Sequence, residues 1–334
     1  MPHRKSLHPR DREPRYPLTS MQHADQRFIS VVEDIRALRI QGAHAICVAA
    51  VREYAAYAQT AGVAHQFVSE YLACLHRARD KLFEARPTEP ALRNSLNYIF
   101  TPKVYASMSL EDVCAAIKKR SGVMLSYLLT AKKKIAHVGA KKIKNGMVIY
   151  THCHSSTVVD ILREAHHAGK RFTVVNTETR PLFQGRITAR ELAEDGIPVH
   201  HFVDSAIRIA IKQADLALIG TDAIDYDMKV YNKIGSEMIA EIASNYKVPV
   251  YACTEAIKYD AMTSEIHKEK IEERSPDEVW SDAPEGVVIQ NFAFEKVDPT
   301  LIAGIISELG IQSPKEFRAQ IRKRYPEWFG TKKH

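Results

Sequence analysis

A cysteine in a polar loop is the residue of this sequence that most strongly indicates chemistry. Residues 147–157 read Met-Val-Ile-Tyr-Thr-His-Cys-His-Ser-Ser-Thr, so an apolar run ends in a loop that contains Cys153. From Ser156 the apolar residues take up helical spacing, which predicts a strand, a tight loop and the start of a helix. The N–H groups and positive dipole end of a helix favour a thiolate over a thiol. Cys153 is therefore predicted to be a reactive group.

A carboxylate stands at the equivalent place further along the chain. Residues 216–220 form another apolar run, and Asp222 follows it. Because ligands bind at the carboxyl ends of parallel strands, Asp222 is expected at the same edge as Cys153. The two groups could act as an acid/base pair if the thiol's pKa is lowered and the carboxyl's is raised by partial burial. A helix cap or turn is the alternative role for Asp222.

Two further segments suit an anion. Residues 232–236 read Asn-Lys-Ile-Gly-Ser and open a helical pattern. Glycine and serine at a helix start, preceded by Lys233, favour phosphate binding, although a serine N-cap with a solvated lysine fits the same residues. Lys258 follows a later strand and adds a cation at the same edge.

A metal site is not expected. His152 and His154 flank Cys153, but alternate residues of an extended strand point to opposite faces. No second cluster shows clear ligand spacing, and Asp225 and Asp227 are typical of a solvated turn.

The elements around these residues change character near residue 140. Helical spacing predicts helices over 35–47, with a break at Gln41 and Gly42, and over 65–84, 89–99 and from 110 onward. Short strands then alternate with helices, which predicts a doubly wound parallel sheet. The expected strands are 148–153, 172–177, 199–203, 216–220, 250–253 and 287–292, and the expected helices are 157–167, 189–194, 206–213 and 237–246.

The fold class is therefore α/β, with an N-terminal α-helical domain followed by a Rossmann-like doubly wound parallel sheet domain. The expected division is a disordered basic tail over 1–26, a helical domain over 27–140, a catalytic α/β domain over 141–325 and a C-terminal tail over 326–334. The loop after the first strand lacks Gly-x-Gly-x-x-Gly, which argues against ordinary dinucleotide binding.

Composition excludes several classes of protein. Charged residues make up 26% of the 334 residues, and no apolar run approaches the roughly 18 residues of a membrane span. The net charge of +7 favours anionic partners. The basic runs 118–120, 132–134 and 141–142 carry few aromatic residues, so solvated helix faces are favoured over nucleic-acid binding. Five cysteines without a CxxC pair predict a reduced, cytoplasmic protein.

Several motifs together resemble a known family. They are residues 151–155 (Thr-His-Cys-His-Ser), 177–181 (Thr-Glu-Thr-Arg-Pro) with Gln184-Gly185, 220–222 (Gly-Thr-Asp) and 232–235 (Asn-Lys-Ile-Gly). The family holds ribose-1,5-bisphosphate isomerase, methylthioribose-1-phosphate isomerase and the regulatory subunits of the eukaryotic initiation-factor-2 exchange factor. The resemblance covers about residues 35–311. The isomerases have the cysteine and aspartate that the regulatory subunits typically lack, and His154-Ser155 is similar to the bisphosphate isomerase.

The resemblance implies an enzyme that converts α-D-ribose 1,5-bisphosphate to D-ribulose 1,5-bisphosphate. Ring opening would precede transfer of hydrogen from C2 to C1, with Cys153 and Asp222 as catalytic residues. The resemblance implies no cofactor and a homo-oligomer, as dimers that assemble into hexamers, and whether a nucleotide activates the enzyme stays open. By match to the family's motifs, the substrate-binding residues would be Gln41, Gly42, Ala43, Arg86, Ser155, Asn232, Lys233 and Lys258.

Two departures from the family pattern leave alternatives open. Gln41 stands where the bisphosphate isomerases usually have arginine, and Asp227-Met228 stands where an Asn-Gly turn is common. Methionine tolerates a positive φ poorly, so this turn is expected to differ. A non-catalytic regulatory protein that senses a sugar phosphate or nucleotide is the first alternative, and methylthioribose-1-phosphate isomerase is the second.

Overall fold

The chain folds into two compact units. A computed structural model describes residues 18–263 and 271–329. Among them, unit 1 comprises residues up to 41, 46–87 and 96–125, and unit 2 comprises 42–45, 88–95 and 126 onward.

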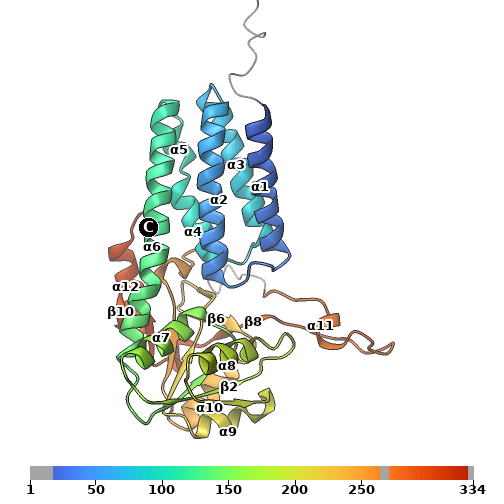
Figure 1. The fold of residues 1–334 in the computed structure, drawn as a ribbon, viewed down its shortest axis with the longest axis vertical. Coiled ribbons are helices and arrows are strands. Elements are labelled where there is room, and N and C mark those ends of the chain that lie inside the picture. Colours follow the sequence, from blue (N-terminus) through green and yellow to red (C-terminus); the bar gives the residue numbers. More distant parts are fainter. Residues whose placement is uncertain (1–17, 264–270, 330–334) are drawn as a thin grey trace, which may run out of the picture. The chain divides into compact units, whose positions relative to one another are not determined.

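The elements of unit 1 are helices. They are α1 (Leu18–Arg36), most of α2 (Ala43–Ala64), α3 (Val68–Ala85), the end of α4 (Pro90–Ile99), α5 (Pro102–Tyr105) and the first half of α6 (Leu110–Ala140), with α1, α2 and α3 side by side in Figure 1. Tyr54, Tyr71 and Phe100 are buried in this unit. The predicted break before α2 is confirmed, since Gly42 has a φ of +83°.

Unit 2 is built on a mostly parallel seven-stranded sheet. The strand order is β10-β9-β7-β4-β1-β2-β3, and β10 is antiparallel to β9. β1 lies between β4 and β2, with Thr151 opposite Leu218 on one side and Asn176 on the other. The strands are β1 (Val148–Thr151), β2 (Thr173–Thr177), β3 (Val199–Phe202), β4 (Leu216–Ile219), β7 (Val250–Cys253), β9 (Gly304–Ser307) and β10 (Gly310–Gln312).

Both faces of this sheet are covered by helices, because successive strand residues point to opposite sides. Ile149 packs in a cluster with residues of α6, α7 (Ser156–His167) and α8 (Gln184–Glu194). Tyr150 packs in a second cluster, with residues of α9 (Ile207–Lys212), α10 (Ser236–Asn245) and α12 (Pro314–Arg324). The predicted α/β class, helical region first and parallel sheet second, is thus confirmed.

A smaller antiparallel sheet, which the sequence did not predict, carries the residues after β4. It has the order β5 (Ala223–Ile224), β6 (Val230–Lys233) and β8 (Phe294–Val297). The short helices η1 (Asp204–Ala206), η2 (Ala256–Lys258), η3 (Pro299–Leu301) and α11 (Asp277–Trp280) complete the described elements.

Three expectations are wrong. Residues 287–292 form no strand, and the strand that follows β7 in the large sheet is β9. Residues 18–26 lie in α1 and not in an irregular tail, while residues 1–17 and 330–334 lie outside the described residues. The β5–β6 turn keeps a positive φ, since Met228 has a φ of +68°.

Burial explains why methionine is accepted in that turn. The side chain of Met228 is 4% exposed and packs in the cluster around Tyr150. Burying it is worth about 1.5–3 kcal/mol, against a left-handed penalty of roughly 1–2 kcal/mol. Asp225 also accepts the Lys229 N–H at 2.9 Å, which closes the turn.

None of the described helices combines the length and the apolar character that crossing a bilayer demands.

Candidate active site

Cys153 lies in the loop between β1 and α7, in an unusual backbone conformation. Its φ is +60°. Its N–H donates a hydrogen bond to Thr179 Oγ1 at 3.1 Å, and Thr188 Oγ1 donates one to its carbonyl at 2.8 Å. A cysteine keeps a left-handed backbone conformation only where its surroundings hold it. These two hydrogen bonds from and to the threonines therefore position the thiol.

Burial decides the protonation of this thiol. Desolvation raises the pKa of Cys153 to about 11; Lys233 and a backbone hydrogen bond from His154 oppose the rise, and the charges of Asp222 and Asp204 add to it. The prediction that the helix start favours a thiolate is therefore wrong, because desolvation of the thiol outweighs the helix terminus. Near neutral pH the side chain is a thiol, which donates a proton before it accepts one.

Asp222 lies near Cys153 because β4 and β1 are neighbours. The two strands pair in parallel, and Asp222 follows β4 as Cys153 follows β1. The backbone N–H of Asp222 donates to the Tyr231 carbonyl at 2.8 Å, which ties it to β6. Since its charge contributes to the raised pKa of Cys153, the two groups lie within electrostatic reach of each other.

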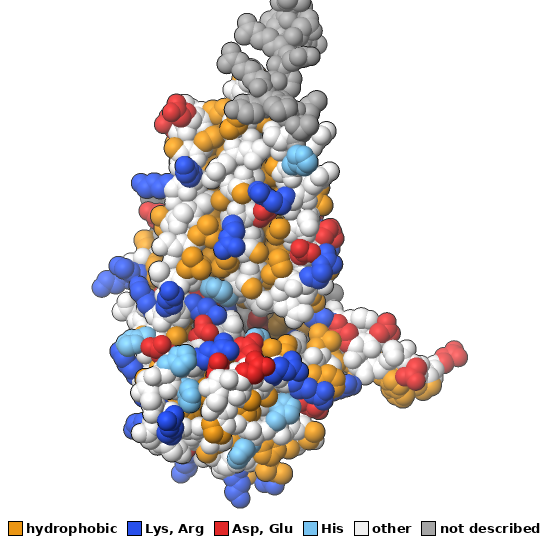
Figure 2. Space-filling view, in the orientation of Figure 1, with side chains coloured by type: hydrophobic (Ala, Val, Ile, Leu, Met, Phe, Trp, Pro, Cys, Tyr) orange, Lys and Arg blue, Asp and Glu red, His pale blue; other side chains and the backbone are white. Residues whose placement is uncertain are grey.

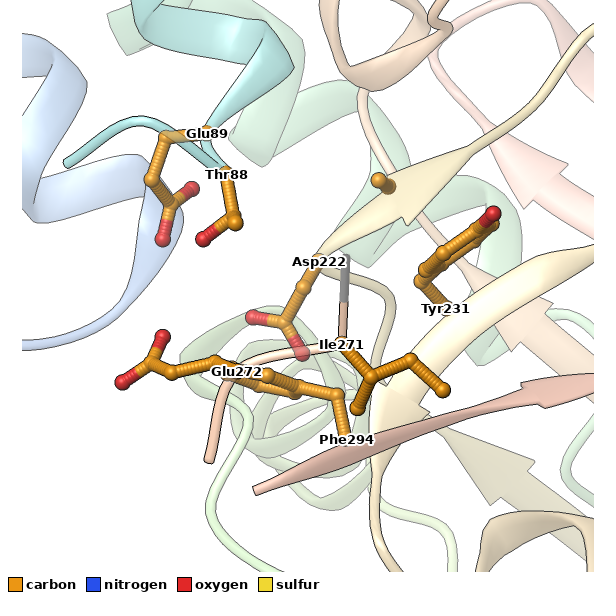
Figure 3. Close-up of a pocket in the computed structure, with 8 residues that line it drawn as sticks. Thr88, Glu89, Asp222, Tyr231, Ile271, Glu272 and Phe294 are labelled. Carbon is orange, nitrogen blue, oxygen red and sulfur yellow. The ribbon is translucent and has the colours of Figure 1, made fainter. Parts of the chain in front are cut away.

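Figure 3 shows a hollow beside Asp222 that is lined by apolar side chains and by three carboxylates. The carboxylates of Glu89, Asp222 and Glu272 face the same space. Carboxylates accept hydrogen bonds and repel phosphate, so this side of the site suits the hydroxyl groups of a ligand. The other lining residues are Thr88, Ala223, Tyr231, Ile271 and Phe294.

Ser155 and Asn232 are brought together at Gly220. A Cβ on Gly220 would lie 2.8 Å from Ser155 Cβ and 3.4 Å from Asn232 Oδ1, so only glycine permits this approach. Ser155 Oγ accepts the Val158 N–H at 3.4 Å and caps α7. Asn232 Nδ2 donates to Ser236 Oγ at 2.8 Å.

Lys233 adds a buried cation next to this cluster. It is 9% exposed, and its Nζ lies 4.9 Å from the ring centroid of Phe294. Its charge works against the rise in the pKa of Cys153, so it acts on the same thiol as Asp222 with the opposite sign.

His152 joins the Cys153 loop to the turn after Lys233. Its Nε2 lies 2.8 Å from the Ile234 carbonyl and its Nδ1 3.3 Å from Thr177 Oγ1. A carbonyl only accepts, so Nε2 carries the proton and Nδ1 accepts from the threonine. Burial lowers the pKa of His152, which keeps the ring neutral.

Lys258 is held in a buried polar network. Its Nζ lies 3.1 Å from Glu255 Oε2 and donates to the Thr221 carbonyl at 2.8 Å. The other oxygen of Glu255 lies 2.8 Å from His44 Nδ1, at the start of α2. Burial acts to lower the pKa of Lys258, but Glu255 and Asp222 outweigh it, and the net shift is upward.

The remaining predicted residues lie in both units. Gly42 and Ala43 belong to unit 2, next to His44 and its bond to Glu255. Gln41 and Arg86 belong to unit 1, where Gln41 is exposed and Arg86 is buried. The structure thus gathers Cys153, Asp222, Ser155, Asn232, Lys233 and Lys258 at one edge of the large sheet.

Sequence reasoning missed the residues that hold this site together. Glu255 comes two residues after the end of the predicted strand 250–253, and that position could have revealed it. The sequence indicates for His152 only the role of a metal ligand, whereas its contact in the structure is with Ile234, 82 positions away. Glu272 follows no recognisable pattern. Within the described part of the chain, no group of three or more His, Cys, Asp or Glu side chains could hold a metal ion.

The fold and the site define a two-unit α/β protein with a buried thiol and a carboxylate at adjacent strand ends. A profile of the Initiation factor 2 subunit family matches residues 39–314, and the chain belongs to this family. The resemblance read from the motifs is thereby confirmed.

Curated relatives of similar length are isomerases. The chain is 33% identical over 295 residues to ribose 1,5-bisphosphate isomerase of Archaeoglobus fulgidus, covering 87% of this chain and 91% of that protein. It is 35% identical over 297 residues to the enzyme of that name from Thermococcus kodakarensis, covering 86% and 92%. It is also 35% identical over 314 residues to methylthioribose-1-phosphate isomerase of Caldanaerobacter subterraneus, covering 86% and 88%. The predicted reaction class, an intramolecular oxidoreductase, is confirmed.

Solved structures share the fold. A Pyrococcus horikoshii protein described as translation initiation factor eIF-2B superposes with a TM-score of 0.75 at 27% identity, covering 87% of this chain and 98% of that one. The 5-methylthioribose 1-phosphate isomerase of the same organism gives a TM-score of 0.72 at 26% identity, covering 89% and 87%.

Proposed function

We propose that this protein is a sugar-phosphate isomerase that converts α-D-ribose 1,5-bisphosphate to D-ribulose 1,5-bisphosphate. The observation that carries the proposal is the pairing of a neutral thiol, Cys153, with Asp222 at the ends of neighbouring strands. Relatives named for this reaction, at 33% to 35% identity over most of their length, support the choice of substrate.

The reaction needs three hydrogen movements. The ring oxygen gains a proton as the C1–O bond to it breaks, and the hydrogen on C2 moves to C1 with its electron pair, as hydride. The C2 hydroxyl loses a proton, so that C2 becomes the ketone carbon. A neutral thiol can supply the first proton, and a carboxylate can accept the second. In this proposal Cys153 begins as the acid and Asp222 begins as the base. Transfer of a proton back from Asp222 to the Cys153 thiolate then restores both groups.

The charges around the pair suit the two ends of such a substrate. Glu89 and Glu272 beside Asp222 would accept hydrogen bonds from sugar hydroxyls. Phosphate groups would bind at Ser155, Asn232, Lys233 and Lys258, with Gln41, Gly42, Ala43 and Arg86 as further proposed contacts. Lys258 Nζ donates to the Thr221 carbonyl at 2.8 Å and lies 3.1 Å from Glu255 Oε2, which holds its ammonium group at the edge where we propose that it binds phosphate.

The proposal extends to the state of the protein. We expect the protein to be a homo-oligomer. We also expect it in a reducing compartment, the cytoplasm, because the described cysteines form no disulfide with one another; they are Cys47, Cys74, Cys114, Cys153 and Cys253. Adding nucleotides to the assay tests whether one activates the enzyme.

Turnover of purified protein with ribose 1,5-bisphosphate tests the reaction. We expect ketose formation that falls by at least about a thousandfold in Cys153→Ser and Asp222→Asn, the scale of general acid–base catalysis. Cys253→Ala is the matched control, because it removes a buried thiol at the end of β7, another strand of the same sheet. Its turnover should stay near that of the wild type.

Two other outcomes would replace the proposal. Faster turnover of methylthioribose 1-phosphate would favour a methylthioribose-1-phosphate isomerase. The chain is 35% identical to one protein of that name. Tight binding of either sugar phosphate without turnover would favour a regulatory protein, as the fold shared with an initiation factor allows.

A further inference from the structure

A second hollow of unit 2 lies at the amino ends of β1, β2 and β3. It measures about 460 Å³ and is lined by the end of α7 and by residues that precede these three strands, with Thr173 at the first position of β2. Because the strands are parallel and Cys153 follows β1, this hollow lies at the opposite edge of the sheet from the thiol. Pockets that bind small molecules usually measure roughly 300–1,000 Å³, so a small ligand fits here.

The helix ends beside the hollow are closed by the chain itself. After α7, the Gly169 N–H donates to the His166 carbonyl at 2.9 Å. After α8, the Gly196 N–H donates to the Ala193 carbonyl at 3.0 Å. Such bonds are typical of helices that end at a glycine, and they occupy carbonyl oxygens that would otherwise attract a cation. The side chains around the hollow therefore determine what it binds.

Three of the lining side chains can donate hydrogen bonds, those of His166, Arg171 and Thr173. A Cβ on Gly196 would lie 3.9 Å from His166 Nε2, so this imidazole reaches the turn before β3. Across residues 18–263 and 271–329, none of the three side chains has a hydrogen-bond or ion-pair partner. These donors serve no contact within the described fold and are therefore available to a ligand.

The backbone of Arg171 is fixed, although its side chain is exposed. The Arg171 N–H donates to Asn145 Oδ1 at 2.8 Å, and the Arg171 carbonyl accepts the Gly146 N–H at 2.7 Å. These two bonds tie the segment before β2 to the segment before β1. Gly146 has a φ of +83°, and a Cβ on it would meet no atom within 4 Å. Glycine therefore leaves open space beside a well-positioned arginine.

The charge around the hollow favours an anion. Residues 141–146, 166–173 and 194–200 together hold five Lys or Arg residues and two acidic ones, a net charge of +3. One of the two acidic residues, Asp195, is paired with Arg163. Figure 2 shows Lys, Arg and His side chains spread over the part of the visible face that unit 2 forms. A guanidinium binds phosphate through two parallel hydrogen bonds, and an imidazole and a hydroxyl add further donors.

We propose that this hollow is a second ligand site, which binds a small phosphate monoester. His166, Arg171 and Thr173 bind the phosphate, while Phe172 and Pro198 in the same wall contact the organic group. The four residues of β1 separate the two edges of the sheet by about 13 Å, so this site is distinct from the candidate active site. The proposal therefore holds whether or not the protein is an isomerase.

Chemical modification of Arg171 tests the site in the full-length protein. Phenylglyoxal modifies exposed arginines, and mass spectrometry of the peptide that contains Arg171 gives the rate. At ten times its dissociation constant, phenyl phosphate should slow this modification about tenfold, because the bound phosphate covers the guanidinium. Arg52, an exposed arginine of α2 in unit 1, is the internal control and should react at one rate throughout. An unchanged rate at Arg171 would overturn the proposal.

The variant Thr173→Val tests one phosphate contact while Arg171 still reports binding. Valine suits a strand and keeps the shape of threonine, but it cannot donate a hydrogen bond. Half protection of Arg171 should then need about tenfold more phenyl phosphate, the effect of losing one hydrogen bond to a charged group. Thr130→Val is the matched control, since the Thr130 hydroxyl on α6 donates to the Ser126 carbonyl at 2.7 Å, and it should leave protection unchanged. Equal protection in the two variants would contradict the assigned contact.

Two smaller probes test the class of ligand. Inorganic phosphate should need at least about tenfold higher concentration than phenyl phosphate, because it has no organic group to bury against Phe172 and Pro198. Phenol has no phosphate and should not protect Arg171. Equal protection by inorganic phosphate would overturn the monoester, and protection by phenol would overturn the phosphate contact. Because Arg171 reports on this hollow alone, phosphate binding at the candidate active site does not produce these results.

Discussion

Glu255 and Lys258 form a buried ion pair, with Lys258 Nζ 3.1 Å from Glu255 Oε2 and side chains 1% and 7% exposed. Breaking such a pair from one side leaves a buried charge without compensation, whereas the pair as a whole is nearly neutral for stability. This relationship makes Glu255 important to the fold, although Glu255 is not itself a proposed catalytic or substrate-binding residue.

The first prediction is that Glu255→Gln destabilises unit 2 by about 3 kcal/mol, the lower end of the cost of breaking a buried pair. Urea unfolding at pH 7 measures this free energy. Glu33→Gln is the control because it breaks the exposed pair with Arg36 and should change the free energy by less than about 0.5 kcal/mol.

The same pair predicts a dependence on pH. Burial acts to raise the pKa of Glu255, but Lys258 and His44 outweigh it and hold that pKa far below its usual value. A carboxyl whose pKa is lower in the folded than in the unfolded state stabilises the fold at pH values above the unfolded pKa, about 4.3 for glutamate. This stabilisation is lost as the pH falls below that value toward the folded pKa. Unfolding free energies of wild type and Glu255→Gln should therefore converge between about pH 4.5 and pH 3. A constant difference over that range would contradict the assignment.

The second prediction concerns the reactivity of Cys153. Burial raises its pKa to about 11, Lys233 lowers it and Asp222 raises it. Alkylation at pH 8 should therefore be slow in the wild type, faster in Asp222→Asn and slower in Lys233→Met, because only the thiolate reacts. Mass spectrometry of the peptide that contains Cys153 gives the rates. Changes of equal sign in the two variants would show that access, and not charge, controls the reaction.

Position along the chain predicted which residues would meet, but not their environment. Cys153 and Asp222 each follow an apolar run, which predicts that both lie at the carboxyl ends of parallel strands. The structure agrees, since β1 and β4 are parallel neighbours in the large sheet. The pKa of Cys153 differs from the prediction because the thiol is buried in a loop that is held by Thr179 and Thr188, which belong to the chain after β2. A local pattern contains no information about such distant neighbours.

Residues 287–292 show the same limit for strands. Their apolar composition predicts a strand, but in the structure only Phe292 among them pairs, in an isolated antiparallel bridge with Glu273.

The third prediction tests the close approach that supports the Cys153 loop. A Cβ on Gly185 would lie 1.8 Å from the Thr177 carbonyl oxygen. Thr177 is two residues before Thr179, which accepts the hydrogen bond from the Cys153 N–H. Gly185→Ala should therefore destabilise unit 2 by about 3 kcal/mol, the upper part of the usual range for overpacking. Gly122→Ala is the matched control. That glycine is exposed in α6 with nothing within 4 Å, so alanine should stabilise the helix by about 1 kcal/mol. Thermal unfolding measures both variants. A change of the same sign and size in the two melting temperatures would contradict this prediction.

The fourth prediction concerns His152, whose pKa burial lowers while its bond to the Ile234 carbonyl opposes the change. A histidine pKa that is lower in the folded than in the unfolded state stabilises the fold above about 6.5, the unfolded value, and this stabilisation is lost as pH falls. The wild type should lose up to about 1.4 kcal/mol per pH unit from this residue below that value. His152→Gln keeps a donor for the Ile234 carbonyl but cannot titrate, so its stability should fall less steeply between about pH 6.5 and pH 5. His137→Gln makes the same substitution at an exposed position of α6 and is the control for the change of residue type. Parallel curves for the wild type and His152→Gln would mean that the ring does not stay neutral between the two loops that it joins.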